Sequence, residues 1–270
     1  MKINEIYLKN FRIFDEINVS FKDRNVIIGP NGSGKTTLIE ALNYVSVLSP
    51  LRTYETDKDL VKVGENYFNI LAKFEHDDGV KSTIFVGYEI KDSSTHKKIK
   101  LDDKKVNVID VSGRLKVVPF LIEDYEVVIG APSWRRKIID NFLIISNPSY
   151  HHNLLNYYKI LKQKNMVLKS IDTSDKGIND KSELDEKKEL VKVYNTDIAK
   201  FAIQITKERY EFFNYILEYM NLHSPIKVDL KYKSQVKIFL EKHQDPVSYY
   251  IEFINSEIEK EIAYGKSMIG

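Results

Sequence analysis

Eight residues near the N-terminus, Gly29-Pro-Asn-Gly-Ser-Gly34-Lys35-Thr36, fit the pattern G-x-x-x-x-G-K-[ST] without a mismatch. Glycines let the backbone curl around an anion, so that successive N–H groups can donate to phosphate oxygens. Lys35 adds a positive charge for the β- and γ-phosphates, and the Thr36 hydroxyl can join the coordination of Mg²⁺. The motif predicts that a nucleoside triphosphate, ATP or GTP, binds at Gly29, Pro30, Asn31, Gly32, Ser33, Gly34, Lys35, Thr36 and Thr37.

The segments on either side agree with this motif. Residues 25–28 form a short β-rich run that ends at Gly29. After the glycines, apolar residues recur at helical spacing: Leu38, Ala41, Leu42 and Val45. A phosphate-binding loop is typically preceded by a β-rich segment and followed by a helix, whereas a flexible surface loop, the alternative interpretation, needs neither.

Composition limits the other classes of function. The 270 residues suffice for one large domain or two ordinary ones, and 41 basic against 39 acidic residues leave a net charge of only +2. Binding to a polyanion therefore requires local clustering of charge. The absence of cysteine excludes disulfides and thiolate metal sites, and the six histidines show no metal-ligand spacing. Because there is no signal peptide and no run of about 20 apolar residues, we expect a soluble, cytoplasmic protein without membrane contacts.

Strand patterns predominate up to about residue 129. Strands are predicted over runs of alternating or β-branched apolar residues: 3–8, 17–21, 68–74, 83–90, 99–101, 106–109 and 117–122. Asp102 and Asp103 are predicted to form a hairpin turn between two of these runs. The run 117–122 is predicted to be a buried strand.

Helical patterns predominate after Pro132, which can open a helix that ends at Asn147-Pro148. Two long helices, at about 150–170 and 184–220, are joined by a polar loop over 171–183, and this arrangement predicts an antiparallel helical hairpin. The remaining segments are predicted to be a strand at 226–232, a helix at 246–264, and a turn at 265–270 that enters a further strand.

Several segments resemble the RecF family of the ABC and SMC superfamily of ATPases. The glycine-rich loop is the variant typical of this superfamily, and Leu-Lys-Asn-Phe-Arg at 8–12 is similar to its N-terminal signature. Residues 48–53 and 59–61 are similar to the RecF stretch that follows the loop helix. The most specific match is Ile-Gly-Ala-Pro-Ser-Trp-Arg-Arg at 129–136, followed by Asp140.

The resemblance continues into the helical part. Residues 147–150 and 161–169 are similar to the arm of RecF proteins. That family usually has arginine where this chain has Lys164, and the exchange keeps the charge but loses a bidentate donor. The likeness extends over nearly the whole chain and is weakest over 171–245.

The resemblance implies an α/β fold: a P-loop NTPase head of ABC/SMC type with a β-rich N-terminal lobe and an inserted helical hairpin arm. It implies a lobe with the P-loop at 1–145, an arm at 146–225, and a return segment at 226–270. It also implies ATP and Mg²⁺ as cofactors and an ATP-dependent homodimer when the head is complete. The implied partners are DNA, single-stranded or at junctions, and RecR and RecO, in recombinational repair and replication-fork maintenance.

Two motifs of the superfamily are not found in this sequence: the L-S-x-G-type signature and the apolar strand that ends in the Walker B carboxylates. The paired acids Asp77-Asp78 and Asp102-Asp103 stand in polar, turn-like contexts. We therefore expect a C-terminally truncated ATPase that hydrolyses ATP weakly or not at all. Two alternatives stay open: an ATPase subunit of a nuclease-coupled defence system of the overcoming-lysogenisation type, and a non-hydrolysing interaction module.

Basic residues outside the loop are further candidates for anion binding. Arg12 either reaches the nucleotide phosphates or is a surface arginine at a strand end. Arg135 and Arg136 either contact DNA or a partner subunit, or form a solvated helix face with weak ion pairs. Lys162 and Lys164, with tyrosines close by, form either a basic and aromatic strip for DNA or a solvated arm helix.

Overall fold

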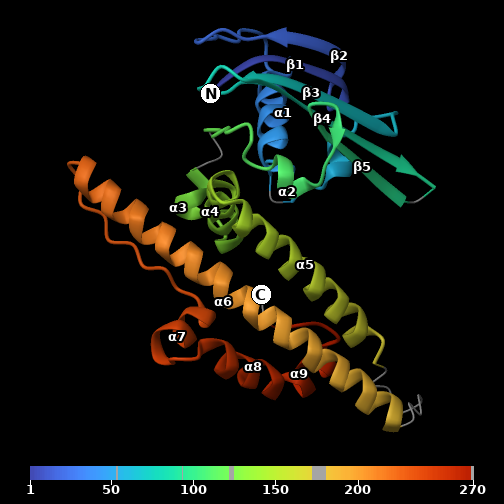
Figure 1. Ribbon diagram of the computed structural model, residues 1–270, viewed down its shortest axis with the longest axis vertical. Coiled ribbons are helices and arrows are strands. Elements are labelled where there is room, and N and C mark those ends of the chain that lie inside the picture. Colours follow the sequence, from blue (N-terminus) through green and yellow to red (C-terminus); the bar gives the residue numbers. More distant parts are fainter. Residues whose placement is uncertain (53, 93, 122–124, 172–180, 269–270) are drawn as a thin grey trace. The chain divides into compact units, whose positions relative to one another are not determined.

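The computed structural model in Figure 1 describes residues 1–52, 54–92, 94–121, 125–171 and 181–268. The chain divides into two compact units, Met1–Pro148 and Ser149–Gly270. The first unit combines a sheet with short helices, and the second consists of helices. Within the described ranges, no helix has both the length and the apolar character that a membrane span needs.

The first unit is built on an antiparallel sheet with the strand order β2-β1-β3-β4-β5-β6. Its strands are β1 (Lys2–Phe11), β2 (Phe14–Ser20), β3 (Tyr67–Glu75), β4 (Lys81–Lys91), β5 (Ser94–Leu101) and β6 (Lys104–Lys105). Leu8 of β1 lies opposite Ile17 of β2 and Ile70 of β3. Because successive side chains of a strand point to opposite faces, this register gathers apolar residues on one buried face. The strands predicted over 3–8, 17–21, 68–74, 83–90 and 99–101 are confirmed.

Helix α1 (Lys35–Val47) lies against the sheet (Figure 1) and contacts β1 and β3. Leu38 and Val45 are buried in the core, and the ring of Tyr44 meets Phe68 of β3 edge-on at 5.6 Å. Each large apolar side chain buried in this way contributes about 1.5–3 kcal/mol. The helix predicted after the glycine-rich loop is therefore confirmed, and its packing fixes the end of the loop.

Asn43 is a polar residue inside this core. It is fully buried, and neither its amide nitrogen nor its oxygen has a hydrogen-bond partner among the residues that the structure describes. Leaving such an amide unsatisfied costs about 1–3 kcal/mol. We expect Asn43→Leu, which keeps the size and improves helix propensity, to raise the free energy of unfolding by about this amount in urea denaturation. Asn43→Asp should lower it; no gain in the leucine variant would contradict the prediction.

Asp102 and Asp103 form the two-residue turn between β5 and β6, as predicted, with φ of 49° and 63°. The strand predicted over 106–109 is wrong, because helix α2 (Val108–Val111) begins there. A reciprocal capping box between Asn107 and Asp110 starts this helix and outweighs the β-propensity of the valines.

Two apolar runs predicted to be strands form none. Residues 25–28 precede the glycine-rich loop, and Val26 and Ile28 are 86% and 89% exposed. In the run 117–122, Phe120 is 90% exposed, and the last residue lies outside the described part of the chain. Both predictions are wrong for the same reason. β-Branched residues form a strand where a neighbouring strand supplies hydrogen bonds, and within the described residues neither run has such a neighbour.

Short helices complete the first unit: η1 (Asp57–Leu60), α2, α3 (Glu126–Ile129) and α4 (Pro132–Ser146). Pro132 occupies the first turn of α4, where its missing N–H costs nothing. The helix ends before Asn147, and the next helix begins at Pro148, so the predicted break at this dipeptide is confirmed.

The second unit contains α5 (Pro148–Lys169), α6 (Lys181–His223), α7 (Gln235–Lys242), α8 (Pro246–Ser256) and α9 (Ile258–Tyr264). Helices α5 and α6 run in opposite directions (Figure 1), and Leu168 of α5 shares a buried cluster with Val191 of α6. A second cluster joins Ala199 and Ile203 of α6 to Tyr250 of α8. The two long helices and the helical segment 246–264 are confirmed.

Other predictions for this unit need correction. The strand predicted over 226–232 is wrong, and the side chain of Asn221 takes the backbone groups that a strand would have paired. It accepts from the N–H of Val228 at 2.8 Å and donates to its carbonyl at 2.9 Å. Of the predicted loop 171–183, residues 172–180 lie outside the described residues and 181–183 already belong to α6. The division into 1–145, 146–225 and 226–270 stays a prediction.

The chain turns after α9, as predicted. Gly265 caps this helix at φ 62°, a left-handed conformation that glycine adopts without strain. The strand predicted to follow falls on residues 269–270, outside the described part of the chain.

Candidate nucleotide-binding site

The glycine-rich loop contains backbone conformations that favour glycine. Gly32 and Gly34 have φ of 81° and 92°. A Cβ atom at Gly34 would lie 2.4 Å from Cζ of Phe14, far inside van der Waals contact. Any other residue at position 34 would therefore strain the backbone and displace this ring. These glycines fix a tight turn at the entry to α1.

The side chain of Lys35 folds back over the loop. Its ammonium group donates to the carbonyl oxygen of Gly29 at 2.8 Å and to that of Pro30 at 2.7 Å. These bonds tie the start of the loop to its end. They also hold the positive charge of Lys35 at the loop itself, where a phosphate chain would need it.

Helix α1 begins directly after the loop and has no side-chain cap. The N–H groups of its first turn have no carbonyl partner in the helix, and the helix dipole favours an anion at this end. Thr36 is exposed in this turn, and its hydroxyl is the kind of oxygen ligand that Mg²⁺ accepts. These donors fit a phosphate group. In the part of the chain that the structure describes, no group of three or more His, Asp or Glu residues could hold a metal ion.

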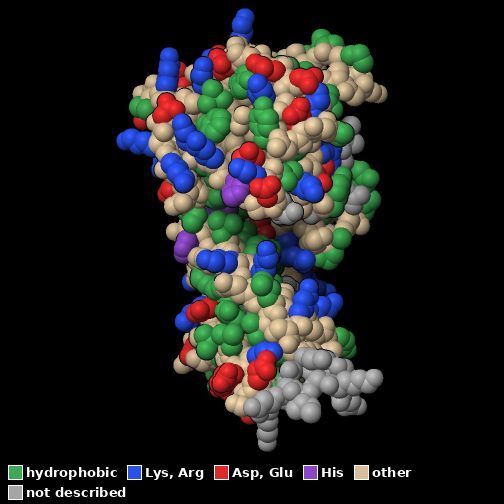
Figure 2. Space-filling model, turned by 90° about the vertical axis from the view of Figure 1, so that its right-hand side faces the viewer, with side chains coloured by type: hydrophobic (Ala, Val, Ile, Leu, Met, Phe, Trp, Pro, Cys, Tyr) green, Lys and Arg blue, Asp and Glu red, His purple; other side chains and the backbone are tan. Residues whose placement is uncertain are grey.

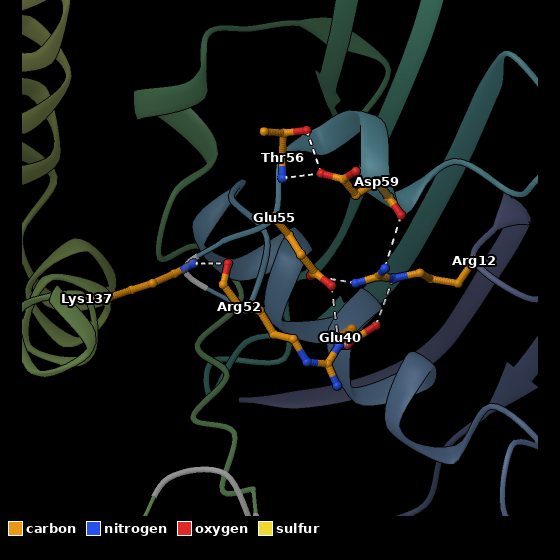
Figure 3. Close-up of polar contacts among 7 residues, drawn as sticks. All are labelled: Arg12, Glu40, Arg52, Glu55, Thr56, Asp59 and Lys137. Atoms are coloured by element: carbon orange, nitrogen blue, oxygen red, sulfur yellow. Dashed lines mark hydrogen bonds and ion pairs between the residues drawn. The ribbon is translucent and has the colours of Figure 1, made fainter. Parts of the chain in front are cut away.

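Arg12 lies in a cluster of buried charges (Figure 3). Its guanidinium pairs with Glu40 of α1 at 3.2 Å and with Glu55 at 2.5 Å, and donates to the carbonyl of Asp59 at 3.1 Å. Glu40 and Glu55 are only 4% and 10% exposed. Arg12 itself sits at φ 55°, so a strained turn after β1 carries the side chain to these carboxylates.

Arg52 completes this cluster, which we call the arginine–glutamate network (Arg12, Glu40, Arg52 and Glu55). Arg52 pairs with Glu40 and lies 3.6 Å from the carboxylate of Glu55. Two arginines thus face two carboxylates, and the buried charges balance. Lys137 of α4 donates to the Arg52 carbonyl at 2.7 Å (Figure 3), which links α4 to the network.

Lys137 gives the protein a pH-dependent stability. Burial lowers the pKa of Lys137 to about 8, and the nearby Glu55 only partly opposes this shift. Between about pH 8 and 10 the unfolded chain holds a proton that the folded chain has released, so stability rises with pH in this window. We expect the unfolding free energy of the wild type minus that of Lys137→Met to increase from about pH 8 to 10 in urea denaturation. A difference that stays constant over this window would contradict the shift.

The sequence did not point to this network. Glu40 stands two residues after Leu38 and directly before Ala41, both of which are buried. A carboxylate inside such an apolar pattern is a usable signal, because a buried charge requires a partner. The partners Arg52 and Glu55 come from a loop, where periodicity gives no information.

Arg135 and Arg136 of α4 are both exposed, as a DNA contact requires. Arg135 also has a structural role, since it donates to the carbonyl oxygens of Val127 at 3.3 Å and Gly130 at 3.0 Å. It therefore anchors the turn before α4. Lys162 of α5 is exposed as well. DNA binding by these three residues stays a prediction.

Lys164 needs a correction. The side chain is fully buried and pairs with the equally buried Glu261 of α9 at 2.6 Å. Burial lowers the pKa of Lys164, and the neighbouring carboxylate opposes that shift. A lysine enclosed in this way cannot reach a DNA phosphate, so the residue belongs to the framework of the second unit.

The fold and the loop define a P-loop ATPase head of the ABC/SMC type. The AAA ATPase domain family matches residues 1–263. The chain is 30% identical to the DNA replication and repair protein RecF of Bacillus cytotoxicus, in an alignment that covers all of this chain and 70% of that protein. The RecF protein of Bacillus mycoides is 29% identical over the same shares. The chain therefore belongs to the RecF family.

Two solved structures support the fold. They are described as RecF-ATP and RecF-ATPrS in the RecFOR pathway, and each matches this chain with a TM-score of 0.80 at 24% sequence identity. They cover 100% and 99% of this chain, and the match covers 70% of each of them. The predicted fold class is thus confirmed.

Proposed function

We propose that this chain is the ATP- and DNA-binding part of a RecF-type repair ATPase. In this proposal, ATP binding drives the dimerisation of two heads on DNA and so helps to load a recombinase. The observation that carries it is the glycine turn at Gly32 and Gly34 with Lys35 folded over it, in a chain of the RecF family. The proposed partners are DNA, single-stranded or at junctions, RecR, RecO and a second head.

The loop residues have distinct roles in this proposal. Bound ATP supplies the negative charge that the loop recognises. The N–H groups from Gly32 to Thr36 donate to phosphate oxygens, and the ammonium group of Lys35 exchanges its two carbonyl partners for the phosphate chain. The hydroxyl of Thr36 joins the shell of a Mg²⁺ ion.

Arg12 is a further candidate for the nucleotide phosphates. It would have to leave Glu40 and Glu55, to which it is now bound. A triphosphate carries more charge than either carboxylate, so this exchange of anionic partners is chemically reasonable. Arg52 would then remain to neutralise Glu40, which prevents a buried, unpaired carboxylate.

The rival functions differ from this proposal in the step after ATP binding. An interaction module would bind ATP without dimerising, whereas a nuclease-coupled ATPase would act on DNA through a separate nuclease. Membership of the RecF family favours the repair ATPase over both. We propose that this chain hydrolyses ATP slowly at most, because its sequence contains neither a recognisable signature segment nor a Walker B strand.

Sedimentation of the purified chain tests the proposal. Mass is measured without ligand, with ATP and Mg²⁺, and with ATP, Mg²⁺ and a gapped DNA. We expect ATP-dependent binding to the gapped DNA; because this sequence contains no signature segment to close the nucleotide between two heads, dimers are expected only when the head is complete. A chain that binds ATP but no DNA would favour the interaction module.

A further inference from the structure

Helix α5 is unusual in its charge. Its 22 residues include four lysines but no aspartate or glutamate. Two lysines of α6 are neutralised within the helix: Lys192 pairs with Glu189 at 2.5 Å, and Lys200 pairs with Asp197 at 3.3 Å. The exposed Lys162 and Lys169 of α5 have no ion-pair partner among the residues that the structure describes. Their charge therefore stays available for an external anion.

These lysines share one face of α5 with apolar side chains. At 100° per residue, Tyr158, Lys162 and Lys169 lie within about 40° of each other around the helix. They line a hollow of about 350 Å³ together with Leu161, Asn165 and Met166. Lys164 and Leu168, about 120° and 80° from Tyr158 around the helix, are buried. We call the outward side the α5 face (Tyr158, Leu161, Lys162, Asn165, Met166 and Lys169).

The α5 face is both basic and open to solvent. Tyr158 is 53% exposed and Met166 is 64% exposed. Figure 2 views the molecule from the side on which α5 lies, and Lys and Arg side chains lie there beside hydrophobic ones. An exposed ring next to unpaired cations is the combination that binds single-stranded nucleic acid, because the ring can stack on a base while the cations hold the backbone.

We propose that the α5 face binds single-stranded DNA, with Lys162 and Lys169 on phosphates and the ring of Tyr158 stacked on a base. The two lysines are seven residues apart, or about 10 Å along the helix, which corresponds to about three nucleotides at stacked spacing. In a duplex the bases are already paired and stacked, so the ring of Tyr158 would have no partner. This inference rests on the proposed function and adds the surface that holds single-stranded DNA.

A pair of double variants tests the lysines. Lys162→Gln/Lys169→Gln removes two charges from the α5 face, and Lys192→Gln/Lys200→Gln removes two locally paired charges from α6. Binding to a fluorescent single strand of about 30 nucleotides is measured by anisotropy over a series of salt concentrations. We expect the first variant to bind about tenfold more weakly and its salt slope to fall by about 1.4, with little change in the second.

Two substitutions test the ring. Tyr158→Ala should weaken binding at least about fivefold without changing the salt slope, and Tyr158→Phe should bind like the wild type, because stacking needs the ring alone. If the wild type binds the single strand and the two double variants bind it with equal affinity, the α5 face is not the binding surface, whereas the proposed function is unaffected. Wild-type chain that binds no DNA would contradict both. Equal effects of Tyr158→Ala on single strand and duplex would overturn the assignment to single strands.

Discussion

Replacing Lys164 with methionine is expected to lower the free energy of unfolding by about 3–5 kcal/mol. Lys164 and Glu261 are both fully buried, and their charged groups lie 2.6 Å apart. Removal of the lysine leaves the carboxylate of Glu261 without its cation in a region that water does not reach. Urea denaturation of the purified chain measures the loss. Lys162→Met, two residues away on the exposed side of α5, should change stability by no more than about 0.5 kcal/mol.

A double variant separates the ion pair from simple loss of packing. Lys164→Met/Glu261→Leu removes both charges, and we expect it to recover at least half of the stability lost in the single variant. Recovery should be incomplete, because the carboxylate of Glu261 also accepts from the Ser267 hydroxyl at 2.9 Å and from the N–H of Met268 at 3.0 Å. If the double variant is less stable than the single one, the buried charge is not the cause.

Gly34→Ala is expected to weaken ATP binding on the order of a hundredfold, which corresponds to the loss of one or two charge-assisted hydrogen bonds. The added methyl group would meet Phe14 at 2.4 Å, and φ of 92° is strained for alanine, so the loop must change its course. Binding of a fluorescent ATP analogue measures the effect.

Gly79→Ala is the matched control for this substitution. Gly79 has φ of 82°, but nothing lies within 4 Å of its Cβ position. The control therefore introduces similar backbone strain without a clash and away from the loop. We expect it to lose some stability and to bind ATP like the wild type. Equal weakening of ATP binding in both variants would mean that the effect comes from general destabilisation.

The parts of the fold that could be predicted are those with a local signal. The turn of two aspartates at 102–103, the helix start at Pro132 and the break at Pro148 each depend on the conformational preference of one or two residues. The long helices α5 and α6 were predictable because their apolar residues repeat over many turns. The glycine-rich loop also has a local signal, because the glycines that define its motif are the residues that adopt the positive φ angles of the turn.

The failed predictions share a dependence on distant partners. Residues 25–28, 117–122 and 226–232 have the composition of strands, but a strand exists only where another strand pairs with it. At 226–232 the side chain of Asn221 takes the backbone hydrogen bonds instead. No pattern within these runs reveals which neighbour will be present.

The site residues show the same limit. Both interpretations of Lys164, a basic strip for DNA and a solvated arm helix, place its side chain in solvent, although it stands four residues before Leu168, on the buried side of α5. That spacing could have indicated burial and a hidden acidic partner. The partner Glu261 lies almost a hundred residues further on, and only the packing of the second unit shows that the two meet.

Titration of the purified chain with ATP and Mg²⁺ in a calorimeter tests the central claim, which is that the loop from Gly29 to Thr36 binds the nucleotide. We expect one ATP per chain for the wild type and for Lys22→Ala, which removes an exposed lysine outside the loop. Lys35→Ala should bind at least about a hundredfold more weakly, because the phosphates lose their nearest cation. A wild-type chain without measurable ATP binding, or a Lys35→Ala chain that binds as tightly as the wild type, would contradict the account.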